Sequence, residues 1–228
     1  MKLIPYYLIF FFCSKAFAQF AVIADQDGYV NIRNEAQIDS KISDTLHNGF
    51  VVYGFEPKNN WVAVDYTKND IALQGYVYKD RIKYLSEFTK VSPNKPTATK
   101  VIFHKDSLSI YIESKVFDSR KAKFTYLKEN KDIIEKINGK KFWGTDGGMP
   151  KTVYKSIKIT KGQKKIDLPV NTFDDLFEPN FFFSHIYYNE KDDVLYIMSS
   201  NSDGAGAYEV VWIIEKGKYR ERKIACQF

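Results

Sequence analysis

Apolar and polar residues alternate along much of this chain with a period of two, which is typical of half-buried strands. In the first third, Val30 and Ile32 alternate with polar neighbours, and so do Val62 and Val64. Turn residues such as those at 48–49 (Asn-Gly) separate these short runs. Because the runs are short and closely spaced, they predict a small closed barrel without a long helix.

The alternation returns after residue 100 and predicts more strands. Residues 157–168 read as a hairpin that turns at Lys161–Gly162. Residues 194–198, 208–214 and 219–225 read as a three-stranded meander. Residues 121–137 fit either a helix or a strand, and residues 174–177 fit a single helical turn capped by Thr172.

A polar segment with two prolines, residues 92–99, divides the chain and reads as a linker. The domain boundaries that follow are a signal peptide at 1–18, a first domain at 19–90, a linker at 91–99 and a β-rich domain at 100–228. The second domain is expected to consist of antiparallel hairpins and a meander, with little helix.

Three motifs of the first domain resemble the bacterial SH3-like (SH3b) family over about residues 21–86. They are Gly-Tyr-Val-Asn-Ile-Arg at 28–33, Trp61 and Gly-Tyr-Val at 75–77. The resemblance implies a small barrel that binds cell-wall peptide or a protein partner, often as an accessory to another domain. The fold expected for the whole chain is therefore mainly β, an SH3-like barrel followed by a β-rich domain that resembles no family known to us. Residues 34–37 and the polar loop 67–70 depart from the family where a ligand groove is expected.

Aromatic rings with a polar edge bind peptide or sugar at a low cost in entropy. The predicted ligand-binding residues of the SH3-like groove are Tyr29, Arg33, Trp61, Tyr66, Tyr76 and Tyr78. Trp61 also fits a residue that fills the barrel interior. Arg33 either clamps a ligand carboxylate or pairs with an acidic residue of its own domain, namely Asp39, Asp44 or Asp80.

Two glycine-rich loops of the second domain, residues 143–150 and 199–208, share a pattern of hydroxyl residue, Asp, Gly and small residue. The candidate contact residues in them are Thr145, Asp146, Gly147, Ser202, Asp203, Gly204, Gly206 and Tyr208. Either these loops present carboxylates and free N–H groups to a ligand, or they are tight connections in which Asp caps its own turn. A calcium site is disfavoured, since neither loop carries a ladder of alternating acidic residues.

The second of these loops prompts another comparison. In composition, although not in register, residues 202–208 resemble the Ser-Gly-x-x-Tyr loop that secreted bacterial lysozyme inhibitors insert into the enzyme's cleft. This resemblance implies an inhibitor or immunity protein against a lysozyme-type cell-wall hydrolase.

The N-terminus predicts secretion. A positive start and an apolar run of about ten residues precede Ala16-Phe17-Ala18, a small-x-small cleavage site that leaves Gln19 as the mature start. The run is too short for a membrane-spanning helix. Simple secretion to the periplasm is favoured over a lipoprotein attached at Cys13, since bulky residues precede that cysteine. Removing Lys2 and Lys15 with the signal lowers the formal net charge from +6 to +4, and no basic cluster with interleaved aromatics points to nucleic acid.

Catalysis is not expected from the residue types present. Cys226 lies close to the C-terminus with no helix behind it, which excludes the cysteine endopeptidases that often follow SH3-like modules. No metal-ligand spacing connects the three isolated histidines, His47, His104 and His185. The remaining enzymatic alternative is a cell-wall hydrolase that uses Asp146 with Asp203, which requires the two loops to meet.

The chain is therefore expected to be a secreted, non-catalytic binding protein without cofactor or metal. Its expected partner is peptidoglycan peptide or an envelope protein, bound by the SH3-like module. The glycine-rich loops are expected to face a second, unidentified ligand.

Overall fold

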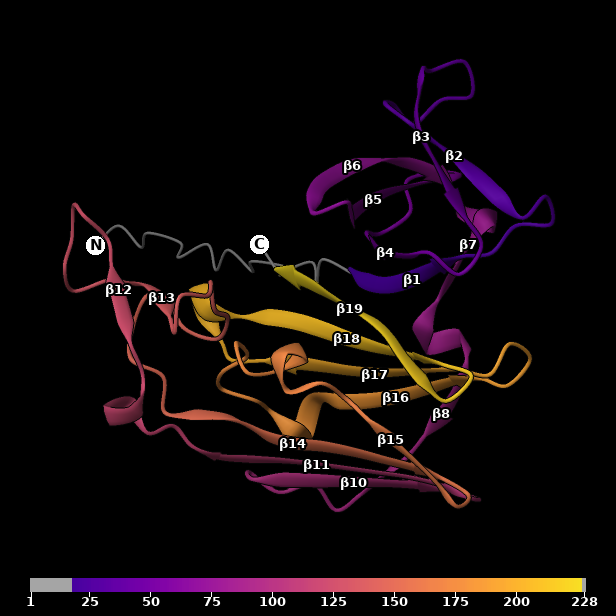
Figure 1. Ribbon diagram of the computed structural model, residues 1–228. Helices are drawn as coiled ribbons and strands as arrows, with labels where there is room; N and C mark the ends of the chain where they lie inside the picture. The colour runs from indigo at the N-terminus through magenta and orange to yellow at the C-terminus, as the bar shows by residue number, and fades with distance from the viewer. Residues whose placement is uncertain (1–17, 227–228) are drawn as a thin grey trace, which may run out of the picture.

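The computed structural model of the chain describes residues 18–226, which form strands joined by turns and short 3-10 segments (Figure 1). The 3-10 segments in this part are η1 (Lys79–Arg81), η2 (Leu85–Glu87), η3 (Ser119–Lys121), η4 (Val170–Thr172), η5 (Phe181–Phe183) and η6 (Gly204–Gly206). The expectation of a mainly β fold is confirmed. The signal peptide predicted at residues 1–18 lies outside the described residues except for Ala18. Among residues 18–226, no helix is long and apolar enough to cross a membrane.

The first part of the chain forms one antiparallel sheet with the strand order β3-β2-β6-β5-β4-β1-β7. Its strands are β1 (Gln19–Ile23), β2 (Tyr29–Arg33), β3 (Ile42–His47), β4 (Val51–Gly54), β5 (Trp61–Lys68), β6 (Ile71–Tyr78) and β7 (Ile82–Tyr84). The sheet curls around a small aliphatic core that includes Val30, Ile32, Val62 and Val64. Because side chains alternate across a strand, the residues between these positions face outward. We refer to this curled sheet, residues 18–88, as the barrel.

The remaining strands form two larger sheets and a short hairpin. The outer sheet has the order β15-β14-β11-β10-β9 and consists of β9 (Pro93–Asn94), β10 (Lys100–Lys105), β11 (Leu108–Val116), β14 (Thr152–Lys161) and β15 (Lys164–Asp167). The central sheet has the order β19-β18-β17-β16-β8 and consists of β8 (Thr89–Val91), β16 (Ser184–Asn189), β17 (Val194–Asn201), β18 (Tyr208–Glu215) and β19 (Lys218–Cys226). Phe103, Ile157, Ile197 and Trp212 belong to the buried cluster that joins the two sheets face to face. The two sheets therefore make a β-sandwich, with the hairpin β12 (Phe124–Tyr126) and β13 (Ile134–Ile137) at one end.

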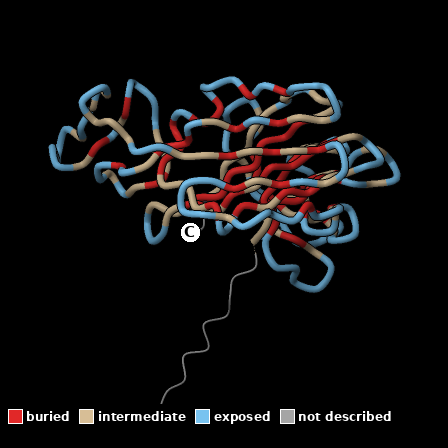
Figure 2. Tube along the Cα trace, turned by 90° about the horizontal axis from the view of Figure 1, so that it is seen from below, coloured by how far each residue is buried: buried red, intermediate tan, exposed pale blue. Residues whose placement is uncertain are grey.

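The central sheet is covered on both faces, by the outer sheet on one and by the barrel on the other (Figure 1). Every residue of β18 from Tyr208 to Ile214 is buried, as expected for a strand without a solvent-facing side. Phe20 and Tyr53 of the barrel pack against Tyr196 and Val211 of the central sheet in one buried cluster. Figure 2 shows the buried segments along the strands in the middle of the molecule and the exposed segments in the loops. The barrel and the sandwich thus share a core.

The segment predicted as a linker begins inside this architecture. Val91 is buried at the end of β8, which pairs with β16 in the central sheet. Pro93 and Asn94 then pair with β10 in the outer sheet. One short segment therefore supplies an edge strand to both sheets, and edge strands are where proline is tolerated.

The predicted hairpin and meander are both confirmed: β14 pairs with β15, and β17, β18 and β19 pair in sequence order. Of the two alternatives for residues 121–137, the strand is correct, since β12 pairs with β13. The helical turn predicted at 174–177 is wrong. The turn lies earlier, at η4, and Leu176 and Phe177 make isolated β-bridges to distant residues. Thr172 donates its hydroxyl to the carbonyl of Pro169 and caps no turn at 174–177.

Candidate functional site

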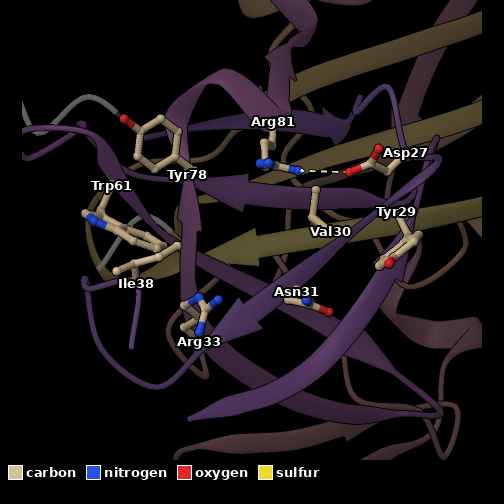
Figure 3. A pocket seen from close by; sticks show the side chains of 9 residues that line it. All are labelled: Asp27, Tyr29, Val30, Asn31, Arg33, Ile38, Trp61, Tyr78 and Arg81. Atoms are coloured by element: carbon tan, nitrogen blue, oxygen red, sulfur yellow. Dashed lines mark ion pairs between the residues drawn. The ribbon is translucent and has the colours of Figure 1, made fainter. Parts of the chain in front are cut away.

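The outward face of the barrel carries a groove of about 350 Å³ (Figure 3). Its lining combines aromatic, aliphatic and charged side chains: Asp27, Tyr29, Val30, Asn31, Arg33, Ile38, Trp61, Tyr78 and Arg81. Four of the six residues predicted for the SH3-like groove are among them, namely Tyr29, Arg33, Trp61 and Tyr78.

Strand alternation places these side chains on one face. Along β2, Val30 and Ile32 are buried, whereas Tyr29, Asn31 and Arg33 are exposed or half-buried on the opposite side. A Cβ atom at Gly75 would lie 2.4 Å from Cγ2 of Ile32, so glycine at this position lets β6 approach β2 closely. Close packing against Ile32 therefore explains why the Gly-Tyr-Val motif begins with glycine.

Trp61 lines the groove and does not fill the barrel interior. It is half-buried at the start of β5, directly opposite Tyr78 of β6. The two rings meet edge to face, with 5.5 Å between their centroids. Ile38, in the loop between β2 and β3, is 74 % exposed and lies beside Trp61 in Figure 3. An apolar contact surface therefore exists at this end of the groove.

Arg33 keeps part of its hydrogen-bonding capacity. Its Nη1 atom donates to the carbonyl of Ser40 at 2.7 Å, which also ties down the loop that carries Ile38. Within residues 18–226, Arg33 forms no ion pair, so the predicted alternative of an internal salt bridge is not realised there. Asp44, one of the three acids considered, pairs instead with Lys68 at 2.5 Å.

Arg81 and Asp27 lie at the other end of the groove (Figure 3), and Arg81 also pairs with Asp25. Nη1 of Arg81 is 2.7 Å from a carboxylate oxygen of Asp25 and 3.8 Å from one of Asp27. The Asp25 side chain is 9 % exposed and that of Asp27 is 70 % exposed. Asp25 is thus the principal partner of Arg81, and Asp27 is a second, solvent-facing carboxylate.

The other two predicted groove residues lie elsewhere. Tyr66 is buried in the barrel core, and its hydroxyl donates to Asp44 at 3.1 Å. Burial, followed by the charge of Asp44, raises the pKa of Tyr66 to about 12. Tyr76 is half-buried and pairs in register with Arg33, so it lies beside the groove without lining it.

The structure brings the two glycine-rich loops of the sandwich together. Ser202 donates its hydroxyl to the carbonyl of Gly144 at 2.7 Å. A Cβ atom at Gly206 would lie 2.9 Å from Cα of Thr145, so the loops touch through their backbones. Together with neighbouring residues they line an open hollow of about 670 Å³, which we call the loop hollow. Its lining includes most of the predicted loop residues, namely Thr145, Asp146, Ser202, Asp203, Gly204 and Gly206.

Two of the residues predicted in these loops, Gly147 and Tyr208, do not line the loop hollow. Tyr208 is fully buried, its hydroxyl donates to the carbonyl of Phe177 at 2.9 Å, and burial raises its pKa well above the ordinary value. Tyr208 is thus a core residue of the sandwich. Gly147 has φ +71° and packs against Ile133, because a Cβ atom there would lie 2.4 Å from Cγ2 of Ile133. Its role in this structure is to let the loop pass close to that side chain.

The chemistry of the loop hollow is polar and open to solvent. Asp146 and Asp203 both line it, and both are exposed. Glu178 is already engaged, since its carboxylate accepts hydrogen bonds from the backbone of Lys151 and from Thr152. In the described part of the chain, no three or more His, Cys, Asp or Glu side chains are grouped to hold a metal ion.

Sequence reasoning missed five residues of the groove: Val30 and Asn31, which belong to the motif at 28–33, and Asp27, Ile38 and Arg81. Asp27 lies just before the Gly-Tyr-Val-Asn-Ile-Arg motif, and Ile38 is an isolated apolar residue in a polar loop. Both are signals that were visible in the sequence, but Arg81 reaches the groove only because η1 follows β6.

Comparisons with family models, with curated proteins and with solved structures find no match to this chain.

Proposed function

We propose that this protein is a secreted, non-catalytic binding protein whose barrel holds a peptide of the cell envelope, such as that of peptidoglycan, in the groove beside Trp61. The observation that supports this proposal most directly is the composition of the groove. Half-buried aromatic rings lie on rigid strands beside an arginine without an acidic partner in residues 18–226. Rings of this kind bind at a low entropic cost, and a guanidinium binds carboxylates with two hydrogen bonds. The resemblance to SH3-like modules supports the same ligand class.

Secretion to the periplasm is part of the proposal. The sequence of residues 1–18 supports it, and β1 begins at Gln19, directly after the proposed cleavage site. Gln19 is held in place, since its side chain accepts a hydrogen bond from Ser86 at 3.0 Å. Cleavage after Ala18 would therefore leave β1 whole.

A second candidate function is inhibition of, or immunity against, a lysozyme-type cell-wall hydrolase. The observation in its favour is that the two glycine-rich loops meet and line one hollow at the end of the sandwich. A partner protein is able to contact both loops at once. The test is a hydrolase assay on bacterial cell walls with the mature protein added. Unchanged hydrolysis at an excess of the protein speaks against this function.

The hydrolase alternative has the least support. Asp146 and Asp203 line the same hollow, as such a mechanism requires. A carboxylic acid that donates a proton works best in an apolar setting that excludes water, whereas both of these side chains are exposed. Release of soluble fragments from peptidoglycan by the mature protein, lost in Asp203→Asn, would establish it.

The main proposal is tested by co-sedimentation of residues 19–228 with purified peptidoglycan. We expect the protein to pellet, and Trp61→Ala to weaken binding by about tenfold or more, since buried aromatic contacts dominate such interfaces. Tyr126→Ala, an exposed tyrosine of β12 outside the groove, is the matched control and should pellet like the parent protein. The proposal fails if the folded parent protein stays in the supernatant, or if Trp61→Ala pellets equally well.

A further inference from the structure

The two ends of the groove differ in charge. In Figure 3, Arg33 lies on the side of Ile38 and Trp61, whereas Asp27 lies on the opposite side with Tyr29 and Arg81. Resting on the function proposed above, we propose that the groove is dipolar and selects a short zwitterionic peptide. Its carboxylate binds Arg33 and its ammonium group binds near Asp27.

The positive end is a guanidinium with unused donors. Among the described residues, Arg33 makes a side-chain hydrogen bond through Nη1 alone, to a backbone carbonyl that carries no charge. No carboxylate within residues 18–226 lies within ion-pair distance of it. A guanidinium has five N–H donors in a planar fork, so a ligand carboxylate can accept two parallel hydrogen bonds there.

The negative end holds more carboxylates than cations. Arg81 faces both Asp25 and Asp27, and it lies much closer to Asp25. Asp25 also accepts a hydrogen bond from the backbone amide of Asp27 at 2.8 Å. One guanidinium therefore balances the nearly buried Asp25, and the exposed charge of Asp27 is left to attract a cation.

The distance between the ends sets the length of the ligand. Tyr29, which lies on the side of Asp27 in Figure 3, is four residues from Arg33 on β2, which corresponds to about 13 Å at about 3.3 Å per strand residue. An extended peptide of about three or four residues has its termini at a similar separation. A single amino acid is too short to reach both ends.

Between the ends, Asn31 is oriented to read the peptide backbone. Its Oδ1 atom accepts a hydrogen bond from the hydroxyl of Thr45 at 3.1 Å, which turns the Nδ2 donors away from that partner. Asn31 lines the groove midway between Tyr29 and Arg33. Its amide can therefore donate to a carbonyl of the bound peptide, while Trp61 and Ile38 contact an aliphatic side chain.

The test uses tetra-alanine in four forms: with both termini free, with the carboxylate amidated, with the amine acetylated, and with both blocked. Binding to the mature protein, residues 19–228, is measured by calorimetry at millimolar peptide. We expect each blocked terminus to weaken binding by about tenfold, because each removes one charge-assisted contact.

Variants assign each terminus to one end of the groove. Arg33→Gln should abolish the difference between the free and amidated carboxylate and preserve the difference between the free and acetylated amine. Asp27→Asn should do the reverse. Arg33→Lys keeps the charge and should therefore restore part of the preference for a free carboxylate. The control is Arg120→Gln, at a residue outside the groove whose side chain is 87 % exposed, and it should bind the four peptides like the parent protein. Equal binding of the four peptides, no binding of any, or a variant pattern that does not separate the termini overturns the inference.

The inference and the proposed function fail in different ways. If peptidoglycan pelleting depends on Trp61 and the four peptides bind alike, the function stands and the dipolar selection is wrong. If the peptides follow the expected pattern and peptidoglycan does not bind, the groove chemistry is right and its natural ligand is another peptide.

Discussion

The barrel and the sandwich use aromatic residues in opposite ways. The barrel core consists mainly of small aliphatic side chains such as Val62 and Val64, and its Trp61 and Tyr78 face outward. The sandwich buries its largest rings, among them Trp212, at the interface between its sheets. The comparison teaches that the candidate contact rings lie on the barrel, whose buried core is aliphatic apart from Tyr66, whereas the sandwich uses large rings to fill the space between its sheets.

The two candidate sites also differ in the structural elements that carry them. Most of the groove lining lies on strands β2, β5 and β6, so the sheet fixes the positions of those side chains. The loop hollow lies on connections whose course depends on glycines, such as Gly144 and Gly206, that permit close backbone contact. We therefore expect truncation of single side chains to alter the groove, and replacement of these glycines to alter the loop hollow.

The sharpest test of this comparison is to truncate one tryptophan in each region. Trp212 is 0 % exposed and donates its indole N–H to the carbonyl of Thr172 at 2.9 Å. Trp212→Ala should lower the free energy of unfolding by about 3–5 kcal/mol, through the cavity and the lost hydrogen bond. Trp61→Ala should lower it by less than about 1 kcal/mol. Urea unfolding followed by circular dichroism measures both, and equal losses would contradict the comparison.

The second test concerns the surface where the two regions meet. Phe20 is buried between the barrel and the central sheet, with its ring 5.1 Å from that of Tyr53. Phe20→Ala should cost about 3 kcal/mol. Phe55→Ala, at a 37 % exposed ring that contacts the same tyrosine, should cost less than about 1 kcal/mol.

Because the core is shared, the parent protein should unfold in one transition. Coincident urea curves by tryptophan fluorescence and far-ultraviolet circular dichroism would agree with this. Two separated transitions would mean that the barrel and the sandwich are independent domains. For the same reason, the binding experiments use the whole mature chain.

The third test addresses the contact between the two loops. Gly206→Ala places a Cβ atom 2.9 Å from Cα of Thr145, and this overlap should cost about 1–3 kcal/mol or separate the loops. Gly148→Ala is the matched control in the same region, since nothing lies within 4 Å of its Cβ position. Peptidoglycan pelleting, which we assign to the barrel, should be unchanged in both. Reduced pelleting by folded Gly206→Ala would mean that the loop hollow contributes to binding.

The smallest expected effect is a pH dependence in the barrel. Burial alone would raise the pKa of Asp44, but hydrogen bonds from Lys68, the Thr45 amide and Tyr66, with the charge of Lys68, hold this pKa below its ordinary value. A carboxyl with a lowered pKa in the folded state stabilises the protein above its unfolded pKa of about 4, and the contribution is lost as the pH falls below that value.

Asp44→Asn should therefore destabilise the protein at pH 7, by less than about 1 kcal/mol because the Lys68 side chain is 37 % exposed. The deficit should shrink as the pH falls towards about 3. Asp39→Asn, at an exposed loop residue, is the control. A deficit for Asp44→Asn that is independent of pH would show that the charge of this carboxyl is not what stabilises the barrel.

Much of the fold was visible in the sequence because strand periodicity is local. The alternation of Val30 with Ile32 and of Val62 with Val64 indicated the strands, and the Lys161–Gly162 turn indicated the hairpin. The same periodicity puts Arg33 on the face opposite Val30 and Ile32, and four of the nine groove residues were predicted, whereas the sequence left open whether Trp61 lines the groove or fills the barrel. The sequence by itself therefore determined these strands, the hairpin turn and the alternation of faces along each strand.

The tertiary structure alone decided what covers each face. Period two puts Tyr66 on the same face as Val62 and Val64, and Tyr78 on the face opposite Val77. Only the curl of the sheet shows that the first face is the barrel interior and that the second lines the groove. Pairings between distant segments also joined Arg81 to the groove and brought Gly206 against Thr145. These contacts depend on how sheets pack, and packing is set by the whole core and not by the residues of one segment.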